Sequence, residues 1–332
     1  MEKPVYRNEK VLFVIAFLLS LAAWGAIAYL SYGVVFALLP AFFLGYLFAQ
    51  SGFICYLKGQ GALVTDSQFP DIQKRVQECA EKTGLKYKPR VYILNGNGVL
   101  NAFATGFLRT KYIVLLSDVL DGVEDKPDAL NFYIGHEMGH LDRKHLFYAP
   151  FLAPALALPL LGAAYSRARE YTCDMYGALC CTPEAAQQGL SLLAVGPKRF
   201  KTLNMQEYLG QTRETSGFWM SFHELIASYP WLVKRYARVS PDPARENIPS
   251  RNFFAFLFAA FIPRLNIVSL AIIYFAFIML AMKGAMPGEG FLKLMQSRDA
   301  ASHIERGEEM TTPDEPAPPE ETPPATKAPD GK

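Results

Sequence analysis

A long uncharged apolar stretch runs from Val11 to Leu57, close to the beginning of the chain. It is too long for one membrane-spanning helix and suits two, because each crossing needs about 20 apolar residues. The short sequence Ser31-Tyr32-Gly33 divides it and has the composition of a turn. The pattern therefore predicts one span over Val11–Leu30, a second over Val34–Cys55, and an N-terminal transmembrane hairpin over residues 1–57.

A second apolar stretch predicts a C-terminal membrane segment over residues 251–283. Within it, Leu265–Met282 is the strongest candidate span. The shorter run Phe253–Ile262 could pair with that span and return the chain to the side from which it came. Residues 284–332 are rich in Pro, Glu and Thr and poor in large apolar residues, so they are predicted to form a disordered tail.

Charged residues around the hairpin predict its orientation. Lys3, Arg7 and Lys10 precede it and Lys58 follows it, whereas the turn carries no Lys or Arg. By the positive-inside rule both ends face the cytoplasm, which predicts a multi-pass protein of the cell (inner) membrane. A cleaved signal peptide is the alternative, since Ala26-Ile27-Ala28 mimics a cleavage site, but the second apolar run follows at once.

Residues 58–250 have the pattern of a mostly helical α+β domain. Ile72, Val76 and Ala80 share one face of a predicted amphipathic helix over Pro70–Lys82. Further helices are predicted from Pro127 to about Lys144, over Ser166–Leu179, and after the cap Thr182-Pro183. Three β-like runs separated by Gly-containing or polar turns predict a small antiparallel meander: Arg90–Leu94, Val99–Thr105 and Lys111–Leu116.

Composition narrows the function classes. The 332 residues carry a formal net charge of +2 and no basic stripe, so nucleic acid is not an expected partner. The hydrophobic fraction of 51% is concentrated in long runs, which favours contact with a lipid bilayer. The five cysteines are odd in number and form no C-x-x-C pair, so we expect reduced thiols.

The sequence His136-Glu137-Met138-Gly139-His140 is the chain's strongest chemical signal. Residues four apart share one face of a helix, so His136 and His140 can both reach one Zn²⁺. Glu137 lies beside that face and can act as general base towards a water held by the metal. The alternative, two ordinary histidines on a helix, is weak because only five histidines occur in the chain. The motif therefore predicts one catalytic zinc ion per chain.

A catalytic zinc site needs a third protein ligand and one open position. The remaining histidines fit poorly, since His145 is expected to point off the ligand face and His303 lies in the tail. Glu170 and Asp174 are four residues apart, so Glu170 could bind zinc while Asp174 accepts a hydrogen bond from a zinc-bound histidine. The alternative is that both carboxylates form surface ion pairs with neighbouring arginines.

The H-E-x-x-H motif is followed some 30 residues later by the pattern S-R-x-x-E-x-x-x-D over residues 166–174. Together with Asn101-Ala102-Phe103-Ala104-Thr105-Gly106, it resembles the membrane metallopeptidases of the HtpX and CAAX-prenyl-protease type. The resemblance covers about residues 70 to 240. It implies a zinc endopeptidase, of which several in the family act in membrane-protein quality control, with His136, His140 and Glu170 as ligands and Glu137 as catalytic residue.

The resemblance also implies two further groups. Asn101, Ala102 and Phe103 match the family's edge strand, beside which a substrate backbone can add as an extra strand, although Asn101 could equally be an ordinary turn residue. A His-Pro pair followed by an arginine is usual late in the domain. Here Tyr229 precedes the proline and Arg235 follows it, so both are candidates for stabilising the oxyanion. His223 is a further candidate for the missing histidine.

An apolar segment, residues 146–165, separates His140 from Glu170 and contains three prolines. A single crossing would place the ligands on opposite sides of the bilayer, so we expect a re-entrant or buried segment that returns. These features predict an integral membrane zinc metalloendopeptidase, with its catalytic domain facing the cytoplasm, that cleaves membrane or misfolded proteins or peptides. The alternative is a catalytically silent membrane scaffold or chaperone-like binder, and a prenyl-protein protease of narrow specificity is a third possibility.

Overall fold

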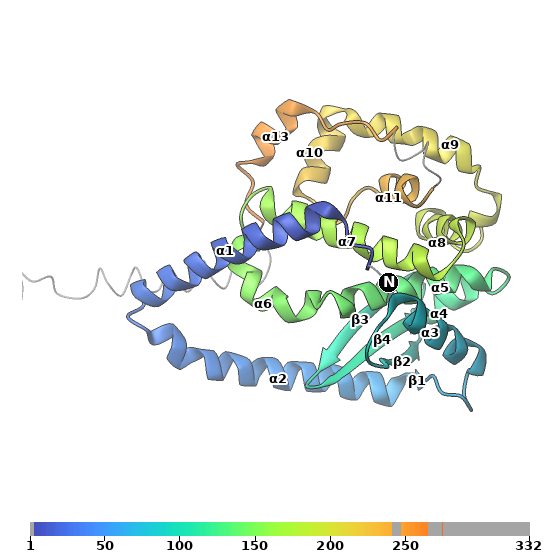
Figure 1. The fold of residues 1–332 in the computed structure, drawn as a ribbon, viewed down its shortest axis with the longest axis horizontal. Coiled ribbons are helices and arrows are strands. Elements are labelled where there is room, and N and C mark those ends of the chain that lie inside the picture. Colours follow the sequence, from blue (N-terminus) through green and yellow to red (C-terminus); the bar gives the residue numbers. More distant parts are fainter. Residues whose placement is uncertain (1–2, 241–246, 265–273, 275–332) are drawn as a thin grey trace, which may run out of the picture. The chain divides into compact units, whose positions relative to one another are not determined.

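The computed structural model describes residues 3–240, 247–264 and 274 of the chain (Figure 1). All of them belong to one compact unit, Met1–Met279. Apart from Tyr274, the span predicted over Leu265–Met282 lies outside the described residues, as does the tail predicted over 284–332. In chain order the elements, with η for short 3₁₀ helices, are α1 (Arg7–Leu30), α2 (Val34–Gln60), β1 (Ala62–Leu63), α3 (Pro70–Thr83), β2 (Arg90–Leu94), β3 (Ala102–Phe107), β4 (Thr110–Leu116), α4 (Ser117–Gly122), α5 (Pro127–Asp142), α6 (His145–Leu156), α7 (Leu161–Cys180), α8 (Pro183–Val195), η1 (Phe200–Thr202), α9 (Met205–Gly210), η2 (Gln211–Ser216), α10 (Phe218–Ile226), α11 (Leu232–Val239) and α13 (Phe253–Ala259).

The two N-terminal helices meet where the apolar pattern predicts, at Leu30 and Val34, and extend beyond the predicted spans at their outer ends, to Arg7 and Gln60. Both α1 and α2 are long and apolar enough to cross a membrane, with mean hydropathies of 2.5 and 1.8. The turn between them uses Tyr32 and Gly33, both with positive φ. Figure 1 shows α1 and α2 (blue) meeting at this turn, away from the sheet, while the far end of α2 passes beneath it. Length and composition thus make two candidate spans.

The sheet is mixed, with the strand order β1-β2-β4-β3. Strand β1 pairs antiparallel with β2, β2 pairs parallel with β4, and β3 pairs antiparallel with β4. The predicted antiparallel meander is therefore wrong. β4 contains a continuous buried run from Tyr112 to Leu116, which suits a central strand, and the chain between β2 and β3 crosses to the far side of it. Asn97 and Gly98, both at positive φ, form that connection, and β3 becomes an edge.

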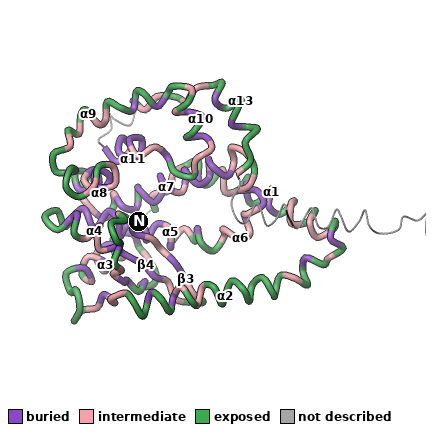
Figure 2. The backbone as a smooth tube through the Cα atoms, turned by 180° about the vertical axis from the view of Figure 1, so that it is seen from behind, coloured by how far each residue is buried: buried purple, intermediate pink, exposed green. Residues whose placement is uncertain are grey.

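Helix α5 occupies the centre of the molecule. Every residue from Ala129 to Gly139 is buried, and the helix begins with Pro127 at its first turn (Figure 2). Its most extensive packing is on α7, and it also packs on α3, α8 and β3. Apolar side chains of the sheet and of α3 fill one side of it, among them Ile113, Leu115 and Val76. A polar side chain between Ala129 and Gly139 has almost no access to water and needs partners within the protein.

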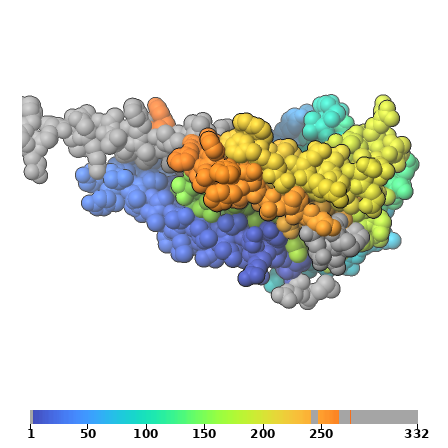
Figure 3. Space-filling view, turned by 90° about the horizontal axis from the view of Figure 1, so that it is seen from above, coloured from blue at the N-terminus to red at the C-terminus, as the bar shows by residue number. Residues whose placement is uncertain are grey.

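The apolar segment after α5 turns back on itself. Helix α6 ends at Leu156, and α7 begins at Leu161 after Leu160 adopts a positive φ of 60°. The two helices pack against each other and against α1. Consequently the beginning of α6 and the middle of α7 both lie next to α5. The C-terminal helices α10 and α13 pack together through Leu225, Ala255 and Ala259, and in Figure 3 yellow and orange surface of this part of the chain lies beside the blue surface of the N-terminal helices.

Candidate metal centre

Helix α5 carries three polar side chains of the predicted site. His136 and Glu137 are buried, and His140 lies one turn further along, partly exposed. The two imidazole rings are 5.2 Å apart between centroids, as expected for residues four apart on one helical face. The structure thus places both histidines side by side within reach of a common atom.

Helix α7 brings Glu170 to the same two rings. Its Oε2 lies 3.4 Å from Nε2 of His136, and its Oε1 lies 3.6 Å from Nε2 of His140. Bonds of about 2.0–2.1 Å in tetrahedral coordination would separate two ligand atoms by roughly 3.3 Å. Both carboxylate-to-imidazole distances are therefore close to the spacing expected between two ligands of one zinc ion. The alternative of surface ion pairs fails for Glu170 and Asp174, because both are buried.

Asp174 fixes the first imidazole. Its Oδ1 lies 3.1 Å from Nδ1 of His136, which leaves Nε2 of that ring directed at Glu170. Arg235 in turn donates two hydrogen bonds to Asp174, of 2.9 Å from Nε and 2.7 Å from Nη2. Burial works against a charge on His136, but the bonds to Asp174 and Glu170 outweigh it and raise the pKa of His136 to about 10. The pocket is thus built to hold positive charge between these two carboxylates.

Glu137 has the environment of a proton acceptor. Burial raises its pKa to about 7, and the positive His136 and a hydrogen bond from the Ala104 backbone amide act in the opposite direction. A carboxyl group with a pKa near neutrality can both take and release a proton at the pH of a cell. Ala104 belongs to β3, so the edge strand and the predicted base are directly connected.

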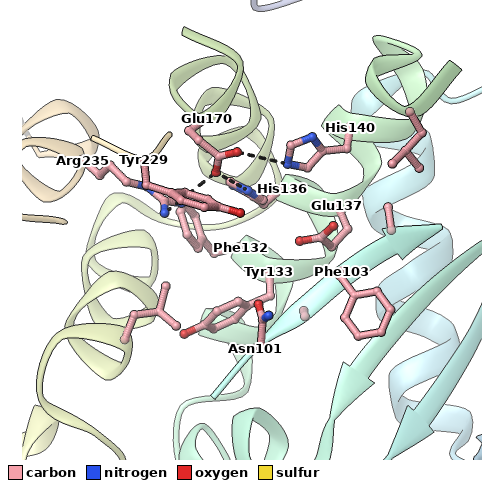
Figure 4. A pocket seen from close by; sticks show the side chains of 14 residues that line it. Asn101, Phe103, Phe132, Tyr133, His136, Glu137, His140, Glu170, Tyr229 and Arg235 are labelled. Carbon is pink, nitrogen blue, oxygen red and sulfur yellow. Dashed lines mark ion pairs between the residues drawn. The ribbon is translucent and has the colours of Figure 1, made fainter. Parts of the chain in front are cut away.

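The predicted residues meet around one cavity of about 200 Å³ (Figure 4). In the close-up, Glu170 and the two imidazoles lie together, the Tyr229 ring extends beside them, and Asn101 lies at the opposite side. The side chain of Tyr229 is 62% exposed. The cavity is lined by Asn101, Ala102, Phe103, Ala104, Phe132, Tyr133, His136, Glu137, His140, Leu146, Glu170, Leu193, Tyr229 and Arg235.

One candidate for the missing histidine is not at the cavity. His223 lies exposed on α10, where it stacks on Trp219, and is not among the lining residues. His303 lies outside the described residues.

His145 was expected to point away from the ligand face, and it is not among the residues that line the cavity, but it contacts the other side of the His140 ring. Its Nδ1 lies 3.0 Å from Nδ1 of His140. Lys144 adopts a positive φ of 56°, so α5 ends and α6 starts in a new direction, which turns His145 back to the preceding helix. A histidine directly after the predicted end of the motif helix was the available signal. Glu9, which contacts His145, offered only its position at the start of an apolar helix.

Cys173 is a second neighbour that the sequence did not single out. Among the described residues, His136, His140 and Cys173 each offer a ligand atom, all within 4.8 Å of one another. Burial and the nearby carboxylates of Glu170 and Glu137 raise the pKa of the Cys173 thiol. Cys173 is also fully buried and absent from the cavity lining, whereas Glu170 lines the cavity. Glu170 and Cys173 are therefore both candidates for the third ligand.

The comparisons with known proteins agree with a site of this class. Residues 66–155 match the model of peptidase family M48, a stretch that includes β3 and the H-E-x-x-H helix. The match bears out the resemblance to HtpX-like metallopeptidases. M48 enzymes are metallopeptidases that usually hold zinc, which supports a peptidase here. No curated protein and no solved structure matched the chain.

Proposed function

We propose that this protein is a membrane-bound zinc metalloendopeptidase. The observation that carries the proposal is the convergence of His136, His140 and Glu170, with Nε2-to-carboxylate distances of 3.4 and 3.6 Å, beside Glu137 in one cavity. These three side chains would hold one zinc ion per chain. Bound zinc supplies a Lewis acid that polarises the scissile carbonyl and lowers the pKa of a water molecule.

Glu137 is proposed to move the protons of the reaction. Its carboxylate takes a proton from the attacking water and delivers it to the nitrogen of the leaving amine. The backbone amide of Ala104 orients this carboxylate. The pKa of about 7 allows the group to serve as base in the first step and as acid in the second.

The edge strand β3 is proposed to bind the substrate backbone. The Leu116 amide donates to the carbonyl of Asn101. In the antiparallel register the backbone N–H and C=O groups of Phe103 and Thr105 therefore also point to β4, and those of Ala102 and Ala104 point away from it. Because the Ala104 amide is bound to Glu137, a substrate in extended form could pair with the groups of Ala102 and with the carbonyl of Ala104. Asn101, Ala102 and Phe103 line the cavity at this edge and would contact the residues next to the cleaved bond.

Gln50 of α2 limits the stretch of β3 that is open to pairing. Its Nε2 donates to the carbonyl of Gly106 over 3.1 Å and to the Thr105 hydroxyl over 2.9 Å. The substrate would therefore pair only beside Ala102 and Ala104. A peptide segment of a few extended residues, as in an unfolded or loop region of a protein, suits this short edge.

Tyr229 and Arg235 are proposed to have different roles in the reaction. The Tyr229 hydroxyl is free to donate to the oxyanion, because its ring lines the cavity and is largely exposed. Arg235 also lines the cavity, but its guanidinium is held by Asp174 and lies 4.0 Å from Glu170. Its charge would strengthen the oxyanion site while its hydrogen bonds hold Asp174 in place.

The membrane placement is part of the proposal. The helices α1 and α2 would form the hairpin of residues 1–57. The apolar sequence of residues 251–283 would form a further membrane segment, around a catalytic domain of residues 58–250. The basic residues on either side of the hairpin favour a cytoplasmic site in a multi-pass protein of the cell (inner) membrane. The returning segment of residues 146–165 keeps the ligand-bearing helices on one side. Misfolded or membrane proteins would be the substrates, as in protein quality control.

The decisive experiment measures zinc content and proteolysis on the full chain in detergent. We expect one zinc per chain and cleavage of unfolded casein. Glu137→Gln should retain the zinc and lose about 10²- to 10⁴-fold in cleavage rate, the range for a general base. A wild-type protein that binds zinc and casein without cleaving would favour the silent binder, and one that binds no zinc would contradict the proposal.

A further inference from the structure

The second zinc-ligand candidate, His140, is connected to the first turn of α1 by a continuous path of hydrogen-bonding atoms. Nδ1 of His140 lies 3.0 Å from Nδ1 of His145, and Nε2 of His145 lies 3.2 Å from Oε1 of Glu9. Glu9 is 1% exposed and His145 is 3% exposed. The Glu9 and His145 part of the path is thus shielded from water.

The directions of the hydrogen bonds follow from the chemistry of the groups. Oε1 of Glu9 also accepts from Nε of Arg143 over 3.0 Å, and a guanidinium can only donate. The same oxygen is therefore an acceptor for His145, and the proton of a neutral His145 lies on Nε2. Its Nδ1 then carries a lone pair, which accepts the Nδ1–H of His140. The Cys173 sulfur lies 3.9 Å from Nδ1 of His145 and is a weaker partner for it.

The consequence for His140 is a fixed tautomer. With its proton held on Nδ1, the lone pair of Nε2 faces Glu170, which is the arrangement a metal requires. His136 obtains the same arrangement from Asp174. The two histidines thus have separate supports, one from α7 and one that begins in α1.

We infer that Glu9 and His145 are positioning residues for the metal centre, acting in series through His140, so that α1 is a structural part of the site and not only an anchor. The inference rests on the proposed function, because it assigns a role toward the same metal. Loss of such an outer hydrogen-bond partner weakens metal binding by about 10- to 100-fold.

Other contacts hold α1 close to the site without joining this path. Trp24 donates from Nε1 to the carbonyl of Phe151 on α6 over 2.8 Å. The Tyr6 amide donates to the hydroxyl of Thr172 on α7, and the rings of Tyr6 and Tyr171 are 5.3 Å apart. Trp24→Phe is therefore a matched control, since it removes one contact between α1 and the core but leaves Glu9 and His145 untouched.

The test compares zinc affinity, measured by competition with a chromophoric chelator, in full-length protein in detergent. The variants are Glu9→Ala, His145→Ala, their combination, Glu9→Gln and Trp24→Phe. We expect Glu9→Ala and His145→Ala each to lower the affinity about 10- to 100-fold. The double variant should bind within about twofold of His145→Ala, because residues acting in series do not add. Glu9→Gln keeps an acceptor oxygen and should lose less than Glu9→Ala, and Trp24→Phe should match the wild type.

Cobalt substitution gives a second readout. The visible absorption of bound Co²⁺ reports ligand geometry, and it should change in Glu9→Ala and His145→Ala but not in Trp24→Phe. Glu9→Gln provides the comparison should Glu9→Ala fail to fold by circular dichroism. Unchanged affinity and spectrum in both Glu9 variants, or losses that add in the double variant, would overturn this inference alone. A wild-type chain that binds no zinc would overturn it together with the proposed function.

Discussion

Gly135 on α5 and Gly177 on α7 pack backbone against backbone. A Cβ on Gly135 would lie 3.0 Å from the Cα of Gly177, and one on Gly177 would lie 2.6 Å from the carbonyl oxygen of Phe132. The two helices that carry the candidate ligands therefore approach more closely than a side chain at either position allows. This approach is what lets Glu170 reach the imidazoles.

Replacing Gly177 by Ala should push α5 and α7 apart. We expect a loss of about 1–3 kcal/mol in the free energy of unfolding, as for overpacking elsewhere, and weaker zinc binding. Denaturant unfolding and zinc competition measure the two effects. Gly59→Ala is the control, because a Cβ there meets nothing within 4 Å and α2 should be unchanged or slightly stabilised. Wild-type stability and zinc affinity in Gly177→Ala would contradict the close-packing argument.

Glu170 and Cys173 lie one turn apart on α7 and compete as the third ligand. Glu170→Ala should lower zinc affinity by more than the roughly 100-fold that loss of an outer partner can cost. Cys173→Ala should change it by less than about threefold, because a buried thiol outside the cavity behaves as a small apolar group. Metal analysis of the two purified variants separates the candidates. A larger loss in Cys173→Ala would assign the third ligand to sulfur.

Tyr229→Phe tests the proposed oxyanion donor. Removing one such donor typically lowers kcat by about 10²- to 10³-fold, and the ring remains to line the cavity. We expect that loss with KM and zinc content unchanged, measured on a fluorogenic peptide. Tyr46→Phe, an exposed tyrosine on α2 that does not line the cavity, should leave kcat as in the wild type. An unaltered kcat in Tyr229→Phe would remove Tyr229 from the mechanism.

Glu224 predicts a pH dependence of stability. It is fully buried and accepts from Lys234 over 2.7 Å and twice from Arg251 over 2.9 Å. Burial alone would raise its pKa, but these two cations outweigh it and lower the pKa below the ordinary value of 4.5. A carboxyl whose folded-state pKa is lowered stabilises the protein above its unfolded-state pKa, and the contribution is lost as pH falls through the folded-state pKa.

Glu224→Gln should therefore be less stable than the wild type at pH 7, by about 3–5 kcal/mol, because the buried Lys234 and the partly exposed Arg251 lose their charged partner. The difference between the two proteins should shrink as pH falls below 4.5. Unfolding curves at several pH values measure it. A difference that stays constant down to pH 3 would mean that the network does not depend on the charge of Glu224.

Local signals in the chain predicted several elements well. The end of α1 and the start of α2 follow from the turn residues that divide the apolar run, and α3 follows from its amphipathic period. Helix α8 follows from Thr182, whose side chain accepts from the amide of Ala185. Each of these depends on residues close in sequence, which is why periodicity and capping suffice.

Strand pairing was not predictable in the same way. The pattern identified three strands but assigned their order from adjacency in the chain, whereas β2 pairs parallel with β4 across an intervening strand. Alternating residues define the faces of a strand and not its neighbour. Only burial of β4 on both sides put β3 at the edge, next to Glu137.

The sequence by itself determined the spacing of His136, Glu137 and His140 on one helix, since a four-residue repeat is a property of the helix alone. It also determined that Glu170 and Asp174 share a face of another. Only the tertiary structure decided that those two faces meet, that His145 turns back to His140, and that Glu9 of α1 reaches His145. Those contacts join residues as many as 136 positions apart, and they depend on how closely α5 packs on α7 and where α1 lies beside them, which no local pattern encodes.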